Sequence, residues 1–433
     1  TERRYADYGA YQDGGEVFCA AFTPESRVLR TANVLTVRTA PAACPELEIV
    51  NRFTVCPDRD AVVQETFYRG APFYDASPLV GSVRVEDAFR TAYCAPLDRR
   101  VTLGTAPVSG PGELTLEDGR RRLTVAGGLV HRTPERIEAH SGSRSYNDTL
   151  SELDERSPVR TVYAFGAALV PVLSRRRAEE LRDAETLESG ALRVRFKRRA
   201  DGVALLSGAE ERALFALRLR HVPTGRELCA DSRSGWEGVQ VCRGEGRMEI
   251  TLRDPLHGAA KGVALRLVAR TLAERGRIEW TAEAENESAE YSLLWCTYPR
   301  LYAEPEGDCD LFVPSHGGTV VRGFNRSDRY TGGAYPSGFC YPMAYFALYD
   351  PAGAEDNGLY CGVHDPGGAL KDLYAVSAQD GRVRFSVRYF APRWGEPGNA
   401  FRLPGTLVWQ RFSGDWFDAT ELYRAFVREE CPW

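Results

Sequence analysis

Strict alternation of apolar and polar residues recurs along this chain and constrains its fold more than any other feature. In the segment 192–197 apolar side chains alternate with arginine or lysine. The same period of two residues recurs in three further segments: 248–252, 278–283 and 383–389. Successive side chains of a strand point to opposite faces, so each segment has one face to bury and one to solvate. The pattern therefore predicts antiparallel sheets rather than the parallel core of an α/β protein.

Dipeptides typical of tight turns separate the strand-like segments. Four of them end in glycine: Asp118-Gly119, Asp201-Gly202, Thr224-Gly225 and Asp380-Gly381. At 433 residues the chain exceeds the usual size of one domain. We therefore predict an all-β protein with two β-sandwich-type domains.

Only two segments are typical of helices. Residues 175–184 are charged and lack glycine and proline, which suits a helical linker between the domains. In residues 415–430, Asp415 and Asp418 can cap the first turn, and arginines lie toward the negative end. An apolar stripe follows at helical spacing: Trp416, Ala419, Tyr423, Phe426 and Val427. The chain is thus predicted to end in an amphipathic helix that packs on a sheet.

Composition excludes several classes of function. A net charge of −5 gives no electrostatic reason to expect a nucleic-acid partner, and no run of ~18 apolar residues suggests a membrane partner. The 11 cysteines form no Cys-x-x-Cys pair, and Cys296 and Cys361 lie in apolar runs. Buried free thiols indicate a reducing, cytoplasmic location. The six scattered histidines suggest no metal site, and no cofactor is expected.

The common catalytic motifs are missing: the sequence contains no nucleophile elbow, Walker A loop, HExxH helix or dinucleotide fingerprint. What remains is a set of glycine-rich, aromatic loops at 314–319, 335–343 and 362–368. The catalytic residues are therefore unknown at this level, and the candidates below are for substrate binding.

Three candidates lie around the third loop. His364 and Asp365 follow a strand-like segment and precede a Pro-Gly-Gly turn, where their side chains could bind sugar hydroxyls or reach into a neighbouring active site. The alternative is that Asp365 only holds the turn. Lys371 could pair with that carboxylate or with a substrate oxygen, the alternative being a solvated surface lysine.

The other candidates are one histidine and a set of aromatic residues. His316, in Ser-His-Gly-Gly, is either a loop ligand or a simple turn residue. Aromatic faces suit the apolar faces of sugar rings, although aromatic residues of β-rich chains also build cores. The predicted stacking platform contains Trp295, Tyr298, Tyr341, Tyr345 and Trp394, of which Tyr341 and Trp394 complete the predicted binding set.

Residues from about 187 onward resemble the N-terminal region of a bacterial glycoside-hydrolase-like family. The segments that carry the resemblance are LESGALRVRF (187–196), TGREL (224–228), MAYFALYD (343–350), GLYCGVHDP (358–366), GDWFDA (414–419) and LYR (422–424). The resemblance implies a galactose-mutarotase-like β-supersandwich whose closing helix leads into a TIM-type catalytic barrel. The first 174 residues lie outside it, except that 47–70 weakly resembles the sandwich of α-galactosidase-like hydrolases.

A TIM barrel takes about 250 residues of alternating strands and helices, and no such alternation is present here. The carboxylates of hydrolysis are therefore expected in a segment outside this chain. The predicted organisation is an N-terminal β domain (1–174), a helical linker (175–186), a supersandwich (187–412) and a closing helix (413–433).

We interpret the chain as the non-catalytic β-sandwich portion of a bacterial glycoside hydrolase. Its expected partners are a carbohydrate and its own downstream catalytic domain, whose sugar pocket it would help to form. Two alternatives stay open. One is a stand-alone sugar epimerase or polysaccharide lyase, for which His221 and His257 lack a supporting partner in the sequence. The other is a carbohydrate-binding module without activity.

Overall fold

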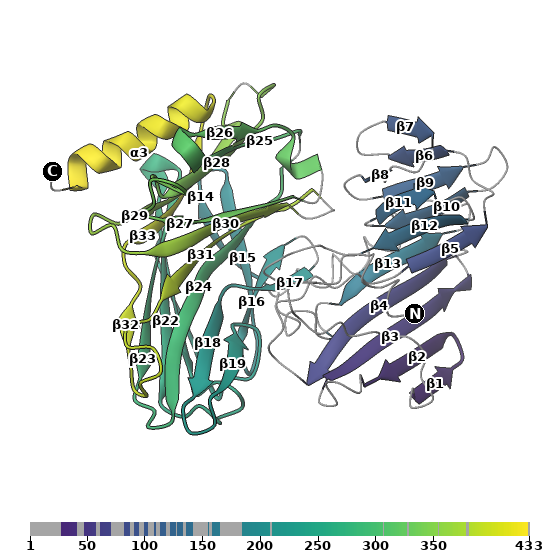
Figure 1. Ribbon diagram of the computed structural model, residues 1–433, viewed down its shortest axis with the longest axis horizontal. Coiled ribbons are helices and arrows are strands. Elements are labelled where there is room, and N and C mark those ends of the chain that lie inside the picture. Colours follow the sequence, from purple (N-terminus) through teal and green to yellow (C-terminus); the bar gives the residue numbers. More distant parts are fainter. Residues whose placement is uncertain are drawn as a thin grey trace. The chain divides into compact units, whose positions relative to one another are not determined.

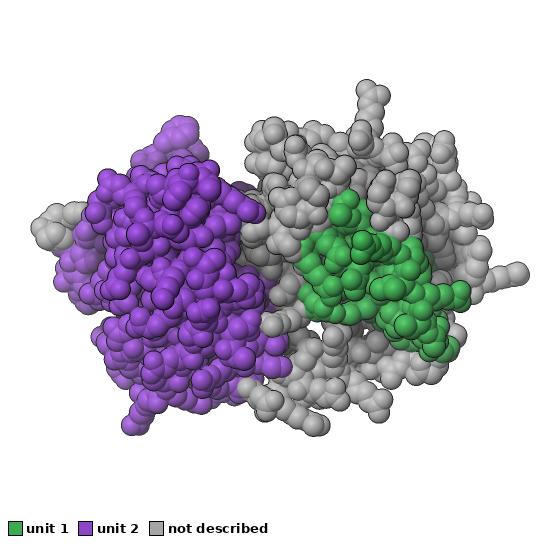
Figure 2. All heavy atoms as spheres, turned by 90° about the horizontal axis from the view of Figure 1, so that it is seen from below, with its two compact units in different colours: residues 1–179, 325–329, 377–382 green, residues 180–324, 330–376, 383–433 purple. Residues whose placement is uncertain are grey.

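The computed structural model describes two compact units, coloured separately in Figure 2. In the first part of the chain it describes residues 27–40, 47–57, 61–70, 82–86, 91–94, 99–102, 108–109, 113–117, 122–126, 128–132, 136–141, 155 and 158–164. From 184 to 431 it describes all residues except 208–209, 306, 327–328, 354 and 378–380. Unit 1 comprises 1–179, 325–329 and 377–382, and unit 2 comprises 180–324, 330–376 and 383–433.

The described strands of the first part form two antiparallel sheets. They are β1 (Arg27–Thr31), β2 (Val34–Thr39), β3 (Leu47–Cys56), β4 (Ala61–Gly70), β5 (Ser82–Glu86), β6 (Thr91–Cys94), β7 (Arg99–Thr102), β8 (Val108–Ser109), β9 (Glu113–Glu117), β10 (Arg122–Ala126), β11 (Gly128–Arg132), β12 (Arg136–Ser141) and β13 (Val159–Ala164). One sheet has the order β1-β2-β3-β4-β13-β10-β9-β6-β7, and the other has the order β5-β12-β11-β8.

The second part is also almost entirely β (Figure 1). Its strands are β14 (Glu185–Ser189), β15 (Leu192–Arg198), β16 (Val203–Ser207), β17 (Glu210–Ala213), β18 (Ala216–His221), β19 (Arg226–Asp231), β20 (Gly238–Gly244), β21 (Arg247–Arg253), β22 (Val263–Leu272), β23 (Arg277–Asn286), β24 (Tyr291–Ala303), β25 (Asp310–Val313), β26 (Thr319–Val321), β27 (Arg329–Tyr335), β28 (Tyr345–Tyr349), β29 (Gly358–His364), β30 (Lys371–Ser377), β31 (Val383–Phe390), β32 (Phe401–Arg402) and β33 (Thr406–Phe412). Three short 3₁₀ turns (Ala273–Arg275, Ser315–Gly317 and Phe324–Arg326) and α3 (Trp416–Glu430) complete it.

These strands build three sheets. A four-stranded sheet has the order β14-β15-β16-β17, and a six-stranded sheet has the order β19-β18-β24-β31-β30-β27. A ten-stranded sheet has the order β20-β21-β22-β23-β33-β29-β28-β25-β26, with β32 pairing β23. Every pairing with a determined register is antiparallel, including β9 with β10 and β22 with β23. The predicted all-β, sandwich-like fold with antiparallel sheets is confirmed.

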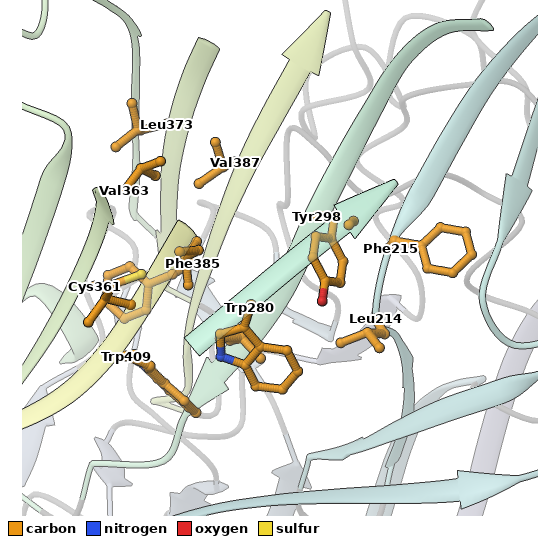
Figure 3. Packing of buried hydrophobic residues seen from close by; sticks show 14 of the residues in the cluster. Leu214, Phe215, Trp280, Tyr298, Cys361, Val363, Leu373, Phe385, Val387 and Trp409 are labelled. Carbon is orange, nitrogen blue, oxygen red and sulfur yellow. The ribbon is translucent and has the colours of Figure 1, made fainter. Parts of the chain in front are cut away.

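The core of unit 2 lies between the six- and ten-stranded sheets. Trp280 of β23 meets Tyr298 of β24 edge to face, with ring centroids 6.5 Å apart (Figure 3). The ring of Phe346 in β28 lies 6.0 Å from that of Phe385 in β31. The alternating segments place their apolar residues here, because only that face of each strand is shielded from water. Cys361 is buried as well, in agreement with its predicted core position, and burial raises the pKa of its thiol.

The predicted helical linker needs a correction at its end. Its residues 175–183 lie outside the described part of the chain, whereas Glu185 and Thr186 belong to strand β14. The alternation that begins at Leu187 extends backward, and Glu185 pairs with Phe196 of β15. Strand pairing with β15 therefore decides the conformation of these two residues.

The predicted C-terminal helix is confirmed as α3. Asp415 accepts a hydrogen bond from Phe417 N (2.8 Å), and Asp418 accepts one from Asp415 N (3.0 Å), which completes a capping box. Its buried residues are Ala419, Tyr423 and Phe426. Tyr423 stacks on Tyr345 of β28, so the helix covers the outer face of the ten-stranded sheet at β28 and β29.

Removing this cap should weaken α3 measurably. Asp415→Ala is expected to lower the free energy of unfolding by about 1 kcal/mol, because two backbone N–H groups lose a partner. Glu429→Ala, an exposed change in the same helix, should stay within about 0.5 kcal/mol. Urea unfolding followed by tryptophan fluorescence measures both, and equal effects of the two changes would contradict the role of the cap.

Candidate functional site

Three of the predicted binding residues are buried at the end of β29 and the start of β30, where Asp365 and Lys371 form an ion pair. His364 and Asp365 are 7% exposed and Lys371 is fully buried. The Lys371 Nζ donates to Asp365 Oδ2 (2.7 Å) and to the carbonyl of Ala369, and it lies 4.9 Å from the centre of the Tyr335 ring. The interpretation of Lys371 as a solvated surface lysine is therefore wrong. Asp365 supplies the paired charge that makes burial of the ammonium possible.

Asp365 also holds the turn that follows β29. Its Oδ1 accepts from Gly367 N (3.1 Å) and its Oδ2 accepts from Ala369 N (2.8 Å). Both carboxylate oxygens are thus engaged within the protein, as the turn-holding alternative predicted.

His364 lies under helix α3. Its ring stacks on Phe426, with centroids 4.2 Å apart, and Nε2 is 3.1 Å from the Tyr360 hydroxyl. The Arg277 guanidinium lies 3.4 Å from Nδ1. Burial, assisted by the charge of Arg277, lowers the pKa of His364 to about 3, so the imidazole is neutral near pH 7.

His316 and Tyr341 lie in different surroundings. His316 is exposed in a turn with a φ of 52°, and its Nδ1 is 2.7 Å from the Ser315 hydroxyl. Tyr341 is 2% exposed, and its hydroxyl pairs with Thr331 Oγ1 at 2.9 Å. Burial raises the pKa of Tyr341 to about 12. Tyr341 is therefore a core residue, and the structure does not place it beside Trp394 on a common surface.

The predicted aromatic platform is only partly assembled. Tyr298, Tyr341 and Tyr345 are at most 2% exposed and belong to the core, so their assignment to the platform is wrong. The large apolar area of a tyrosine ring makes a sandwich interior its default position. Trp295 and Trp394, by contrast, come together with ring centroids 6.1 Å apart, and Trp394 is 55% exposed.

Strand register explains why a group of aromatic and charged residues forms around Trp295. In the six-stranded sheet Trp295 of β24 lies opposite Arg218 of β18 and Phe390 of β31. The Arg218 and Arg388 guanidinium carbons lie 5.4 and 5.3 Å from the centre of the Trp295 ring. We give the name Trp295 face to the group formed by Arg218, Trp295, Tyr330, Tyr374, Arg388, Phe390 and Trp394, in which Tyr374 is buried and Tyr330 and Trp394 are exposed. Cation–π contacts hold both arginines against the indole.

The loop that presents Trp394 is anchored by a buried asparagine. Asn399 is fully buried, and its side chain accepts from Leu293 N (2.7 Å) and donates to Leu293 O (2.9 Å) and Pro392 O (2.8 Å). Arg393, next to Trp394, has a φ of 55°, a left-handed conformation that a non-glycine residue adopts at an energetic cost. The loop is thus fixed to β24 in a strained form that exposes the indole.

The polar groups of the Trp295 face differ in whether they have hydrogen-bond partners. Arg218 donates to Glu227 (3.1 Å), and the Tyr374 hydroxyl donates to Asp372 (2.9 Å). Arg388 lies between Trp295 and Tyr374, and its guanidinium carbon is 5.2 Å from the centre of the Tyr374 ring. Arg388 has no hydrogen-bond acceptor among the described residues. Exposed aromatic faces beside a free guanidinium can stack on a sugar ring and donate to its oxygens.

Arg218 and Arg388 were missed by sequence reasoning. In the sequence, both arginines simply lie in strand-like segments near an apolar run. Arginine is so frequent in this chain that this position did not distinguish them. Within the described residues no group of three or more histidine, cysteine, aspartate or glutamate side chains could hold a metal ion. None of the described helices is long and apolar enough to span a membrane.

Comparison with known proteins shows a local similarity to one glycoside-hydrolase-like sequence. No protein-family model matches it. A protein of Monosiga brevicollis, named as a candidate glycoside hydrolase, is 28% identical over 137 residues, which are 31% of this chain and 11% of that protein. The resemblance to glycoside-hydrolase-like proteins is confirmed by this match. The relative is eukaryotic, so a bacterial origin of this chain stays a prediction.

Solved α-galactosidases are among the structures that match this chain, with low structural similarity. AgaA from Geobacillus stearothermophilus, a GH36 enzyme, matches 58% of this chain and 43% of its own at 13% identity and a TM-score of 0.40. A variant of AgaA in complex with stachyose has the same identity and TM-score over 57% of this chain and 43% of its own. The α-galactosidase of Lactobacillus brevis covers 92% and 42% at 10% identity and a TM-score of 0.31. The chain thus spans about two fifths of the length of these enzymes.

Proposed function

We propose that this chain is the non-catalytic β-sandwich portion of a glycoside hydrolase and that the Trp295 face binds its carbohydrate. The observation that carries the proposal is the exposed Trp394 beside Trp295. The guanidiniums of Arg218 and Arg388 lie against the Trp295 ring. The similarity to the Monosiga protein supports the same class of function. The carboxylates of hydrolysis would then belong to a catalytic domain that works beside this one.

The roles of the residues follow from their positions. The Trp394 indole stacks on a sugar ring, because half of its surface is open to solvent and its loop is fixed by Asn399. Arg388 donates to ring or hydroxyl oxygens, since none of the described residues supplies an acceptor for it. Tyr330, 41% exposed and 6.1 Å from Tyr374, extends the aromatic surface.

The cysteines support the expected cytoplasmic location, which is part of the proposal. Eight cysteines of the described residues are free, and several are buried in the core. Free thiols persist in a reducing compartment.

Removing the exposed indole should abolish most of the binding. Trp394→Ala is expected to weaken binding of a neutral oligosaccharide at least about tenfold, which corresponds to about 1.4 kcal/mol. Raffinose and stachyose are suitable first probes in isothermal titration calorimetry, together with longer plant and bacterial oligosaccharides.

Trp416→Ala is the matched control, because Trp416 is also partly exposed (41%) but lies on α3. It should change the dissociation constant less than twofold. Equal losses in both variants, or wild-type protein that binds none of the sugars, would overturn the proposal. Turnover of a sugar by this chain alone would contradict its non-catalytic role.

A further inference from the structure

The ten-stranded sheet carries a hollow on its outer face that the proposed function does not use. Its volume is about 220 Å³. The hollow is lined by Arg247, Arg266, Val268, Arg270, Thr281, Ala282, Glu283 and Arg402, from strands β21, β22, β23 and β32. Four guanidiniums thus line the hollow with one carboxylate, so positive charge is in excess on its wall.

Strand register brings these residues together. Arg247 of β21 lies directly opposite Arg270 of β22, and Glu283 of β23 lies opposite both Arg266 and Arg402. The residues between them on β22 are buried in the core, so the arginines must point to the outer face. The hollow is therefore fixed by the sheet itself and not by a loop.

The nearby carboxylates do not balance these charges. Glu249 is bound by both Arg247 and Arg266, each at 2.7 Å, and these bonds lower its pKa. Glu279, which lies opposite Arg270, forms its ion pair with Arg277 at 2.7 Å. The guanidinium of Arg270 makes no ion pair or hydrogen bond to any described residue.

The same holds for Arg402, whose guanidinium makes no ion pair or hydrogen bond to any described residue despite the neighbouring Glu283. Like charges directly opposite in a sheet, as in Arg247 and Arg270, are destabilising. The ion pairs with Glu249 account for Arg247 and Arg266 but not for Arg270 and Arg402, and a bound anion would relieve the repulsion.

We propose that this hollow binds the carboxylate or sulfate group of an acidic saccharide. The planar guanidinium matches such oxyanions with two parallel hydrogen bonds. The volume is below the range of about 300–1,000 Å³ of sites for drug-sized ligands, so it suits one charged substituent and part of its ring. Anion binding follows from the arginines alone, while the saccharide as carrier rests on the proposed function.

The first test uses inorganic sulfate and thermal unfolding. At constant ionic strength set with chloride, sulfate should raise the Tm of the wild-type protein more than that of the Arg270→Gln/Arg402→Gln variant, because a ligand of the native state stabilises it. Sulfate also stabilises proteins without binding to a site, and the variant measures that part. In chloride alone the variant should be as stable as the wild type or more so, since one like-charge pair is gone.

Arg253→Gln is the matched control. Arg253 lies at the other end of β21 from Arg247, on the same face and exposed, but it does not line the hollow. It should keep the full effect of sulfate. An equal rise of Tm in all three proteins would overturn the anion site.

The second test uses a short oligouronate, a sulfated oligosaccharide and a neutral oligosaccharide of the same length. The double variant should bind the two acidic sugars at least about tenfold more weakly than the wild type. The affinity of the wild type for them should fall with ionic strength.

The two sites can be told apart. Trp394→Ala should remove binding of the neutral sugar, and the double variant should leave that binding unchanged. Wild-type protein that binds the acidic sugars but not the neutral one would contradict the proposed function and leave the anion site standing. A sulfate effect without any binding of acidic sugars would overturn the saccharide part of this inference.

Discussion

Asp365→Asn is expected to lower the free energy of unfolding of unit 2 by about 3–5 kcal/mol, because the change leaves the Lys371 ammonium buried and unpaired. Lys371 is fully buried, and Asp365 Oδ2, 2.7 Å away, is the one carboxylate oxygen bonded to it within the described residues. Denaturant unfolding followed by tryptophan fluorescence reports on unit 2, since all seven tryptophans belong to it.

The pH dependence of this variant adds a second signature. Burial lowers the pKa of Lys371, whereas Asp365 opposes that shift. Without the carboxylate the pKa of the lysine should fall further below that of the unfolded chain. Above the lowered pKa the native state has released the proton that the unfolded state still holds, so stability rises with pH. The loss caused by Asp365→Asn should therefore shrink at alkaline pH.

A double variant separates the charge from the turn. Asp365→Asn/Lys371→Met should recover much of the lost stability, because a buried pair replaced by neutral side chains is often nearly neutral in energy. Glu396→Gln is the control for an exposed pair, since Arg393 and Glu396 are 58% and 62% exposed. It should cost less than about 1 kcal/mol. If the double variant is no more stable than Asp365→Asn, the turn and not the ion pair sets the cost.

The fold could be predicted from the sequence because its signals are local. Alternation fixes which side of a strand faces the core, and it predicted the antiparallel sheets. The capping residues Asp415 and Asp418 and the stripe of α3 are likewise determined within four residues of each other. Each of these predictions needed no knowledge of what the segment packs against.

The candidate site depends on contacts between distant residues and was only partly predictable. Trp295 lies in the run Leu293-Leu294-Trp295-Cys296, which is apolar throughout, so alternation cannot assign its face. A register shift in the pairing of β18 with β24, between Arg218 and Leu219, accompanies its position on the solvent side. Burial of Lys371 likewise depends on an aspartate six residues earlier and on the ring of Tyr335.

His364 should make unit 2 less stable in acid. Burial and the charge of Arg277 lower its pKa to about 3, against 6.5 for an ordinary histidine. Between these values the unfolded chain binds a proton that the native state does not, so stability falls as pH decreases through this window. From pH 7 to pH 5 the contribution of His364 amounts to a loss of about 2 kcal/mol.

The neighbouring groups show why the native imidazole stays neutral. Arg277 has only donors, so Nδ1 must accept and Nε2 carries the proton toward the Tyr360 hydroxyl. Phe426 of α3 covers the ring, and the carboxylate of Asp365 is engaged by Lys371. Protonation of Nδ1 would place two cations side by side beneath a helix, without a free carboxylate among these neighbours to compensate.

His364→Gln removes the titrating group and should flatten this part of the pH profile. We would measure the free energy of unfolding between pH 5 and pH 8. From pH 7 to pH 5 it should fall by about 2 kcal/mol less in the variant than in the wild type. His316→Gln, at an exposed turn, should keep the wild-type profile. Parallel profiles of the wild type and His364→Gln would contradict this prediction. They would show that the native imidazole takes up a proton as readily as that of the unfolded chain and that α3 does not shield it from water.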